Sequence, residues 1–476
     1  MNDDRKKPSL VLALVPVGAL IGFLAAGVFA LEASPHLPMI LGCAVAAVIG
    51  KGLGYDWKAL QGGMVKGISI AMPAVLVLMA IGILIGAWVA SGVVPLLVFY
   101  GLKLLSPEVF LVASCVICAV VSISTGSSWS TAGTVGVALM GVAGGLDVSL
   151  GMAAGAVVSG AYFGDKLSPL SDTTNLAAGV AEVPLFTHIR HMLWTTGPSF
   201  LIALALFGIL GRGAGEGANP AQVEGLIETL QNEFNLTPWL FLAPLSVIAL
   251  IALRMPALPA ILIGAAVGAV LGPAVQGVSG GEMYTAMQGG YAASTGDAQV
   301  DELLSRGGLE SMFGTIGIII CAMAFGGLME CTGMLAAIAN GVLKIARSTG
   351  SLVVSTLATC VGMNIAAPDQ YLSIVVPGRM YKEAYAKAGL APKNLSRCLE
   401  DAGTLSSPLV PWNTCGAFMM GALGVNPLVY LPFAFFNLLC PVVSAVLGFT
   451  GWTMEKAPSS GSERPEESRG LSVHFP

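Results

Sequence analysis

GDKLSPLSDTTNLA, residues 164–177, places two aspartates, a lysine, four hydroxyl side chains and an asparagine in a chain that is otherwise apolar for dozens of residues on either side. On insertion scales an ionised side chain at the centre of a bilayer costs about 2.5–3.5 kcal/mol, so such groups are kept mainly where they face a cavity or a pathway. The stretch therefore predicts a functional site inside a membrane protein rather than a simple membrane span.

The composition supports a membrane location. The 476 residues are 55% hydrophobic and 10% charged, with a mean hydropathy of +0.81, whereas soluble domains carry about 25% charged residues. The 61 glycines and 27 prolines favour helices that pack closely or break inside a bundle. We predict an all-α polytopic membrane protein with about 11–14 transmembrane segments and broken or re-entrant helices.

Several classes of function and partner are disfavoured. The net charge of −5 comes without a basic stripe, so we expect no nucleic-acid partner. The sequence contains neither an HExxH motif nor a P-loop, and the nine cysteines mostly lie in apolar runs, so we expect neither an enzyme nor a bound cofactor. The expected partners are the lipid bilayer and the transported solutes, and homodimerisation stays open.

Loop charges predict the topology. Arg5, Lys6 and Lys7 precede an apolar run too long for a signal peptide, so we expect an uncleaved first span and a cytoplasmic N-terminus. A basic loop at 51–66 is placed on the cytoplasmic side, and the acidic loop at 277–310 outside. The predicted segments are N-terminal helices (1–59), a first transport repeat (60–211), linking helices with acidic loops (212–305), a second repeat (306–426), a C-terminal helix (427–453) and a disordered tail (454–476).

A faint internal repeat relates the two transport segments. Gly86 and Gly92 recur as Gly327 and Gly333, each 241 positions later, and the polar break at 126–128 falls on 367–369 by the same offset. Ser-Pro-Leu at 168–170 recurs at 407–409. Because the first repeat follows a basic loop and the second an acidic one, we predict inverted repeats, which place a binding site near the bilayer midplane between their broken helices.

The polar groups near these breaks suit a small hard cation. Pro169 disfavours a continuous helix between Asp165 and Asp172, so backbone carbonyls are expected to be free beside the second aspartate. Carboxylate, hydroxyl and amide oxygens are the ligands of hard cations. We predict Na⁺ at Asp172, Thr173, Asn175 and Asp369, within a wider site that includes Asp165, Thr174, Ser127, Ser128, Asn364, Ser407, Asn413 and Thr414.

These carboxylates also have structural interpretations. Asp165 and Lys166 could form an interfacial pair at a helix end, Asp172 could cap the following helix, and Asp369 could begin one. In the functional interpretation, an aspartate in a poorly solvated cavity holds a proton more tightly and can exchange it for a metal cation. Such competition would be sufficient for antiport.

Three motifs resemble those of the NhaC-type Na⁺/H⁺ antiporter family: GAYFGDKLSPLSDTTNLAAGV at 160–180, STGSSWSTAGTVG at 124–136 and SSPLVPWNTCGAF at 406–418. The resemblance implies a secondary carrier of the bacterial cytoplasmic (inner) membrane, in the ion-transporter superfamily, that exchanges Na⁺ for H⁺ without ATP. It implies roles for Asp165, Ser168 and residues 172–175, faced by Ser407, Pro411, Trp412 and Asn413. Relatives of this kind also move malate against lactate, or amino acids, so a small organic anion or amino acid is the alternative solute.

Overall fold

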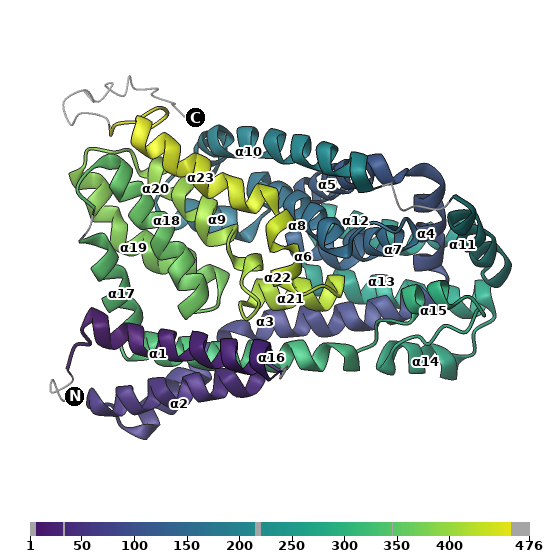
Figure 1. The fold of residues 1–476 in the computed structure, drawn as a ribbon, viewed down its shortest axis with the longest axis horizontal. Coiled ribbons are helices and arrows are strands. Elements are labelled where there is room, and N and C mark those ends of the chain that lie inside the picture. Colours follow the sequence, from purple (N-terminus) through teal and green to yellow (C-terminus); the bar gives the residue numbers. More distant parts are fainter. Residues whose placement is uncertain (1–5, 32–33, 215–219, 345, 458–476) are drawn as a thin grey trace, which may run out of the picture.

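The computed structural model describes residues 6–31, 34–214, 220–344 and 346–457, and within these ranges the regular structure is helical apart from one isolated β-bridge. Most long helices run along the long axis of the molecule (Figure 1). Arg5, which contributes to the predicted N-terminal orientation, and the tail at 458–476 lie outside the described residues. The predicted all-α class is confirmed.

Seven described helices are long and apolar enough to cross a membrane, or up to nine if two sharply bent helix pairs each count as one span. The bent pairs join α11 (Pro220–Glu233) to α12 (Leu242–Ala252) at 96° and α21 (Thr414–Leu423) to residues 427–433 at 87°. The seven are α1 (Leu10–Leu24, extended by a π-helical turn), α3 (Trp57–Ala90), α5 (Pro107–Thr125), α10 (Leu185–Ala214), α13 (Ala257–Leu271), α16 (Phe313–Cys331) and α18 (Thr349–Ala366).

The count is lower than the 11–14 segments predicted, because several apolar runs form helices shorter than a bilayer-spanning length. Four such helices have 10–17 residues: α2 (His36–Gly52), α4 (Val93–Leu104), α17 (Met334–Leu343) and α23 (Phe435–Thr450). The chain is a multi-pass membrane protein in either count.

The helix order repeats. In the first half α3, α4 and α5 precede a break, then come α6 (Ser128–Thr131), α7 (Val137–Gly145) and α8 (Leu150–Leu167), a second break, and α9 (Asp172–Val180). In the second half α16, α17 and α18 precede a break, then come α19 (Gln370–Lys387) and α20 (Pro392–Cys398), a second break, and α21. Gly92 and Gly333 occupy matching turns and have left-handed φ values of 82° and 76°, a conformation that glycine adopts without strain.

The helices that open the two halves pack side by side in opposite directions. Gly63 on α3 lies against Cys331 at the end of α16, whereas Gly82 near the end of α3 lies against Met312, just before α16 begins. Between them, a Cβ atom on Gly67 would overlap the carbonyl oxygen of Met323, so the two backbones approach as closely as glycine allows. Equivalent helices that run antiparallel are the arrangement that inverted repeats require.

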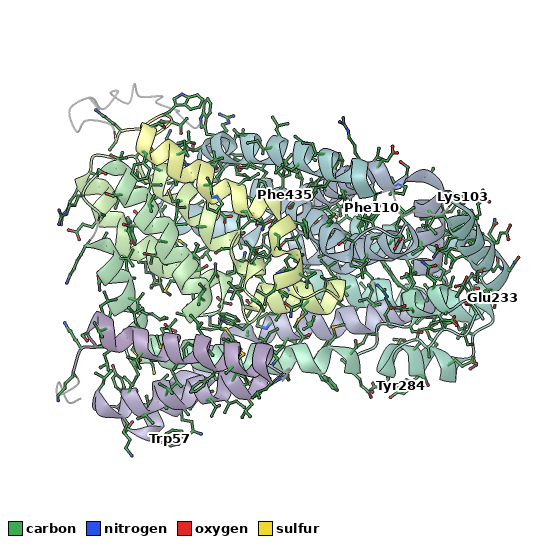
Figure 2. All side chains as sticks on the ribbon, in the orientation of Figure 1. Trp57, Lys103, Phe110, Glu233, Tyr284 and Phe435 are labelled. Carbon is green, nitrogen blue, oxygen red and sulfur yellow. The ribbon has the colours of Figure 1, made fainter. Side chains whose placement is uncertain are left out.

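The charged connections lie at opposite ends of the molecule. The turn between α2 and α3 is at the left in Figure 1, and the acidic region with α14 (Gly280–Gly289) and α15 (Ala298–Leu304) is at the right. In Figure 2, Trp57 at the start of α3 and Glu233 at the end of α11 mark the same two ends. The basic and acidic loops therefore face opposite sides, while the assignment of one side to the cytoplasm stays a prediction.

Two predicted breaks and one predicted tail can be compared with the structure. The helix at α5 stops at Gly126, whose φ is 69°, and α8 stops at Leu167, four residues before Ser171 caps α9. At the C-terminus, Glu455 and Ala457 form backbone hydrogen bonds to Ala391 and Gly389. The segment expected to be disordered from 454 thus starts with residues held against the α19–α20 connection.

Candidate functional site

One cavity collects the broken helix ends of both repeats. It has a volume of about 420 Å³ and lies between α3, the end of α8 and the N-terminal ends of α6, α9, α19 and α21. The predicted carboxylates Asp165, Asp172 and Asp369 all line it. Its other lining residues are Ile70, Pro73, Ala74, Val77, Ser127, Ser128, Trp129, Ala257, Gln370, Tyr371, Thr414 and Cys415.

Polar side chains cap the four helices that begin at this cavity. Ser127 accepts a hydrogen bond from the Ser130 N–H before α6, and Ser171 accepts one from the Thr174 N–H before α9. Asp369 and Asn413 cap α19 and α21 in the same way. A helix N-terminus carries a partial positive charge, so these ends offset part of the negative charge of the three carboxylates. The carboxylates and the capping oxygens make the cavity suited to a small cation.

Asp165 ends α8 and is 3% exposed. One of its carboxylate oxygens accepts hydrogen bonds from the N–H and the hydroxyl of Ser128, at 3.2 and 2.6 Å, so the first break is tied to the end of α8. Its other oxygen is buried and has no hydrogen-bond partner among the described residues.

The predicted pairing of Asp165 with Lys166 is wrong. Lys166 forms a wholly buried ion pair with Asp401, which lies in the π-helical segment Leu399–Thr404 of the second repeat. Successive residues of a helix point about 100° apart, so Asp165 can face the cavity while Lys166 points into the protein. The signal that sequence reasoning missed was the Glu400-Asp401 pair, two acids that directly follow a basic region.

Asp172 and Asp369 approach the cavity from different repeats. Asp172 is exposed to the cavity and accepts a hydrogen bond from the hydroxyl of Tyr371, so this carboxylate bridges α9 and α19. Asp369 is 3% exposed and accepts the Leu372 N–H at 3.0 Å. Tyr371 was not predicted as a site residue, although it stands only two positions after the aspartate of the second break.

Other predicted site residues of the first repeat stabilise the break instead of facing the cavity. Ser168 donates its hydroxyl hydrogen bond to the Ile123 carbonyl at 2.8 Å, and Thr174 donates to the Lys166 carbonyl at 3.1 Å. Thr173 contacts the Ser171 hydroxyl, and Asn175 donates to the Pro169 carbonyl at 3.0 Å. The side chains of Thr173 and Asn175 therefore do not line the cavity with Asp172 and Asp369, although the Thr173 N–H donates a hydrogen bond to Asp172 at 2.8 Å. Asn175 lines a separate cavity beside Arg379.

The second repeat shows the same division. Thr414 lines the cavity, whereas Asn364 and Asn413 bond to each other at 2.9 Å and fix the end of α18 to the start of α21. Ser407 donates to the Thr404 carbonyl at 2.7 Å. The indole of Trp412 donates to the Ile365 carbonyl at 3.0 Å, and its ring lines a different, smaller cavity. These side chains hold the broken helices in place around the aspartates.

The sequence is similar to those of known antiporters. Residues 160–452 match the sequence model of the Na⁺/H⁺ antiporter family. The chain is 39% identical over 461 residues to the Na⁺/H⁺ antiporter NhaC of Alkalihalophilus pseudofirmus. The matched region covers 97% of this chain and 100% of that protein.

Two further relatives are antiporters of other solutes. The chain is 36% identical over 449 residues to the malate-2H⁺/Na⁺-lactate antiporter of Bacillus subtilis, covering 94% of this chain and 96% of that protein. It is 39% identical over 478 residues to the arginine/ornithine antiporter ArcD of Halobacterium salinarum, covering 98% and 96% of the two chains. The match to the family model and the similarity to NhaC along the whole chain show that the chain belongs to the Na⁺/H⁺ antiporter family.

Proposed function

We propose that the protein exchanges Na⁺ for H⁺ across the cytoplasmic membrane, with the ions alternating at the cavity lined by Asp165, Asp172 and Asp369. The observation that carries the proposal is the convergence of three carboxylates from both inverted repeats on one cavity. A carboxyl group in or beside this cavity can hold a proton while the cation is absent and lose it when the cation binds, and this competition couples the two ions without ATP. The NhaC antiporter named above, which is similar over the whole chain, supports the same reaction.

Na⁺ is expected between Asp172 and Asp369, with Thr414 as a neutral oxygen donor beside them. No group of three His, Cys, Asp or Glu side chains in the described ranges lies close enough to share one metal ion. The other oxygen ligands of the cation would then be hydroxyl groups, backbone carbonyls or water. Movement of one repeat against the other would bring the carboxylates together, which is how inverted-repeat carriers gate a midplane site.

A second candidate function has a specific observation in its favour. A volume of about 420 Å³ is far larger than a bare Na⁺ requires and lies within the range of small-molecule sites. The helix N-terminal ends could hold a carboxylate group, and the aspartates could hold an ammonium group. These groups would suit an amino acid, or a small organic anion accompanied by Na⁺. Malate, lactate, arginine and ornithine, the solutes for which two relatives are named, belong to these substrate classes.

Proteoliposomes that contain a pH-sensitive dye distinguish the candidates. Addition of Na⁺ alone should move protons if the first proposal is correct. Silence until malate, lactate, arginine or ornithine is added would refute it and favour the second.

We also expect the N-terminus and Lys58 on the cytoplasmic side and Asp301 outside. Labelling of single cysteines at positions 58 and 301 in intact cells would test this topology.

A further inference from the structure

Glu400 is a buried carboxyl group that the proposed ion cavity does not use. It lies in the π-helical segment Leu399–Thr404, it is 0% exposed, and it lines none of the cavities described above. Neither of its carboxyl oxygens has a hydrogen-bond partner among the described residues. A buried ionised carboxylate without donors is strongly disfavoured, so the group must be neutral or must lie beside a compensating charge.

The charges near Glu400 do not balance. Lys166 and Arg397 are the buried cations, and Asp165, Asp401 and Glu400 are the buried carboxyls of the same region. Three carboxyls against two cations leave one negative charge in surplus, so one proton would make the group neutral. The titratable groups on the elements that pack against this segment include His188 on α10, thiols on α18, α20 and α23 (Cys360, Cys398, Cys440), phenols on α19 (Tyr381, Tyr385) and the carboxylate of Asp172 on α9. The thiols and phenols are neutral at pH 7.

Hydrogen bonding decides which carboxyl takes that proton. Asp401 is paired with Lys166, accepts the Thr195 hydroxyl at 2.9 Å and has the Arg397 Nε atom 3.9 Å from its other oxygen. Asp165 accepts two hydrogen bonds from Ser128. Donors stabilise the ionised form of an acid, and the Thr404 hydroxyl, the donor near Glu400, forms no hydrogen bond with it in this conformation. The proton therefore belongs on Glu400.

We propose that Glu400 holds the exchanged proton while the cavity contains no cation and releases it when Na⁺ enters the cavity that Asp165, Asp172 and Asp369 line. This inference rests on the proposed Na⁺/H⁺ exchange. Glu400 suits a proton better than Na⁺, because no cavity surrounds it and a metal cation would need several converging oxygen ligands.

The step balances in charge and atoms. Na⁺ adds one positive charge at the cavity wall formed by Asp165, the residue adjacent to Lys166. Glu400 then changes from the acid to the carboxylate, and its proton passes to the water that is admitted when one repeat moves against the other. The buried region stays neutral overall in both states, so the low dielectric of the protein interior links loss of the proton to arrival of the cation.

Glu400→Gln tests the assignment, because the amide imitates the protonated acid in shape but cannot release a proton. Purified protein in weakly buffered detergent receives NaCl, with choline chloride as the salt control, and a pH dye records proton release. We expect proton release in the wild type and a release smaller by about tenfold or more in the variant. The variant should still bind ²²Na⁺. The control is Glu330→Gln, which should match the wild type. Glu330 is a partly exposed carboxylate on α16 that pairs with Lys66 on α3.

Infrared difference spectra provide a readout that does not depend on the folding of the variant. Addition of Na⁺ to the wild type should remove the C=O stretch of a buried carboxylic acid, and Glu400→Asp, which keeps an acid, should shift that band. Wild-type proton release in Glu400→Gln, or a wild-type spectrum without loss of the acid band, would overturn the assignment. If Na⁺ releases no proton even from the wild type, the proposed exchange itself is wrong, and the two failures are therefore distinguishable.

Discussion

Replacing Lys166 with methionine tests the buried ion pair between the repeats. Lys166 and Asp401 are both fully buried and bonded to each other, and methionine keeps a similar chain length without the charge. Removing one partner of a buried pair costs about 3–5 kcal/mol, because the remaining charge stays desolvated. Arg397 compensates in part from 3.9 Å, so we expect the lower end of this range. That is about 3 kcal/mol, or roughly a hundredfold in the unfolding equilibrium.

The assay is unfolding by SDS in mixed micelles, followed by tryptophan fluorescence. Lys66→Met is the matched control, since its pair with Glu330 has side chains that are 69% and 32% exposed, and such pairs contribute about 0–1 kcal/mol. The double variant Lys166→Met/Asp401→Asn removes both charges and should recover most of the loss. A loss in Lys166→Met no larger than in the control, or a double variant no more stable than the single one, would refute the reasoning.

Three further predictions address the cavity, the helix packing and the acidic loop. Asp172→Asn should reduce Na⁺-driven proton movement in proteoliposomes by at least about tenfold, and wild-type exchange would remove this residue from the site. Gly67→Ala should lower the free energy of unfolding by about 1–3 kcal/mol, because its methyl group would meet a carbonyl of α16. Gly62→Ala on the same helix meets open space and should be nearly neutral, so equal effects would contradict the close contact. Hydrogen bonds from the Thr295 N–H and hydroxyl lower the pKa of Asp301, so they stabilise the folded loop above the ordinary pKa of an aspartate, and this stabilisation is lost as the pH falls through the lowered value. Relative to their intrinsic exchange rates, loop amides should therefore lose protection in acid, and this loss should be smaller in Thr295→Val. Exchange that follows only the intrinsic pH dependence would be evidence against this.

Local sequence signals were sufficient for the class of protein and for much of its architecture. Hydropathy predicted a helical membrane protein because a span depends on the transfer of consecutive residues into lipid. Gly126 and Pro169 marked the broken helices because their backbone preferences act within a few residues. The recurrence of Gly92 as Gly333 indicated the repeat, and the antiparallel packing of α3 on α16 agrees with it. Family membership, predicted from three motifs, is confirmed.

The sequence by itself determined that acidic side chains would stand at the breaks, since their cost in a membrane requires a cavity or a partner. Only the tertiary structure decided which of those side chains face the cavity and which have a partner inside the protein. Asp165 faces the cavity while Lys166, one residue later, pairs with Asp401 more than 200 positions away, and the side chains of Thr173 and Asn175 do not line the cavity. Such choices depend on the rotation of each short helix and on contacts across the repeats. They are fixed by packing between distant segments, which no local pattern records.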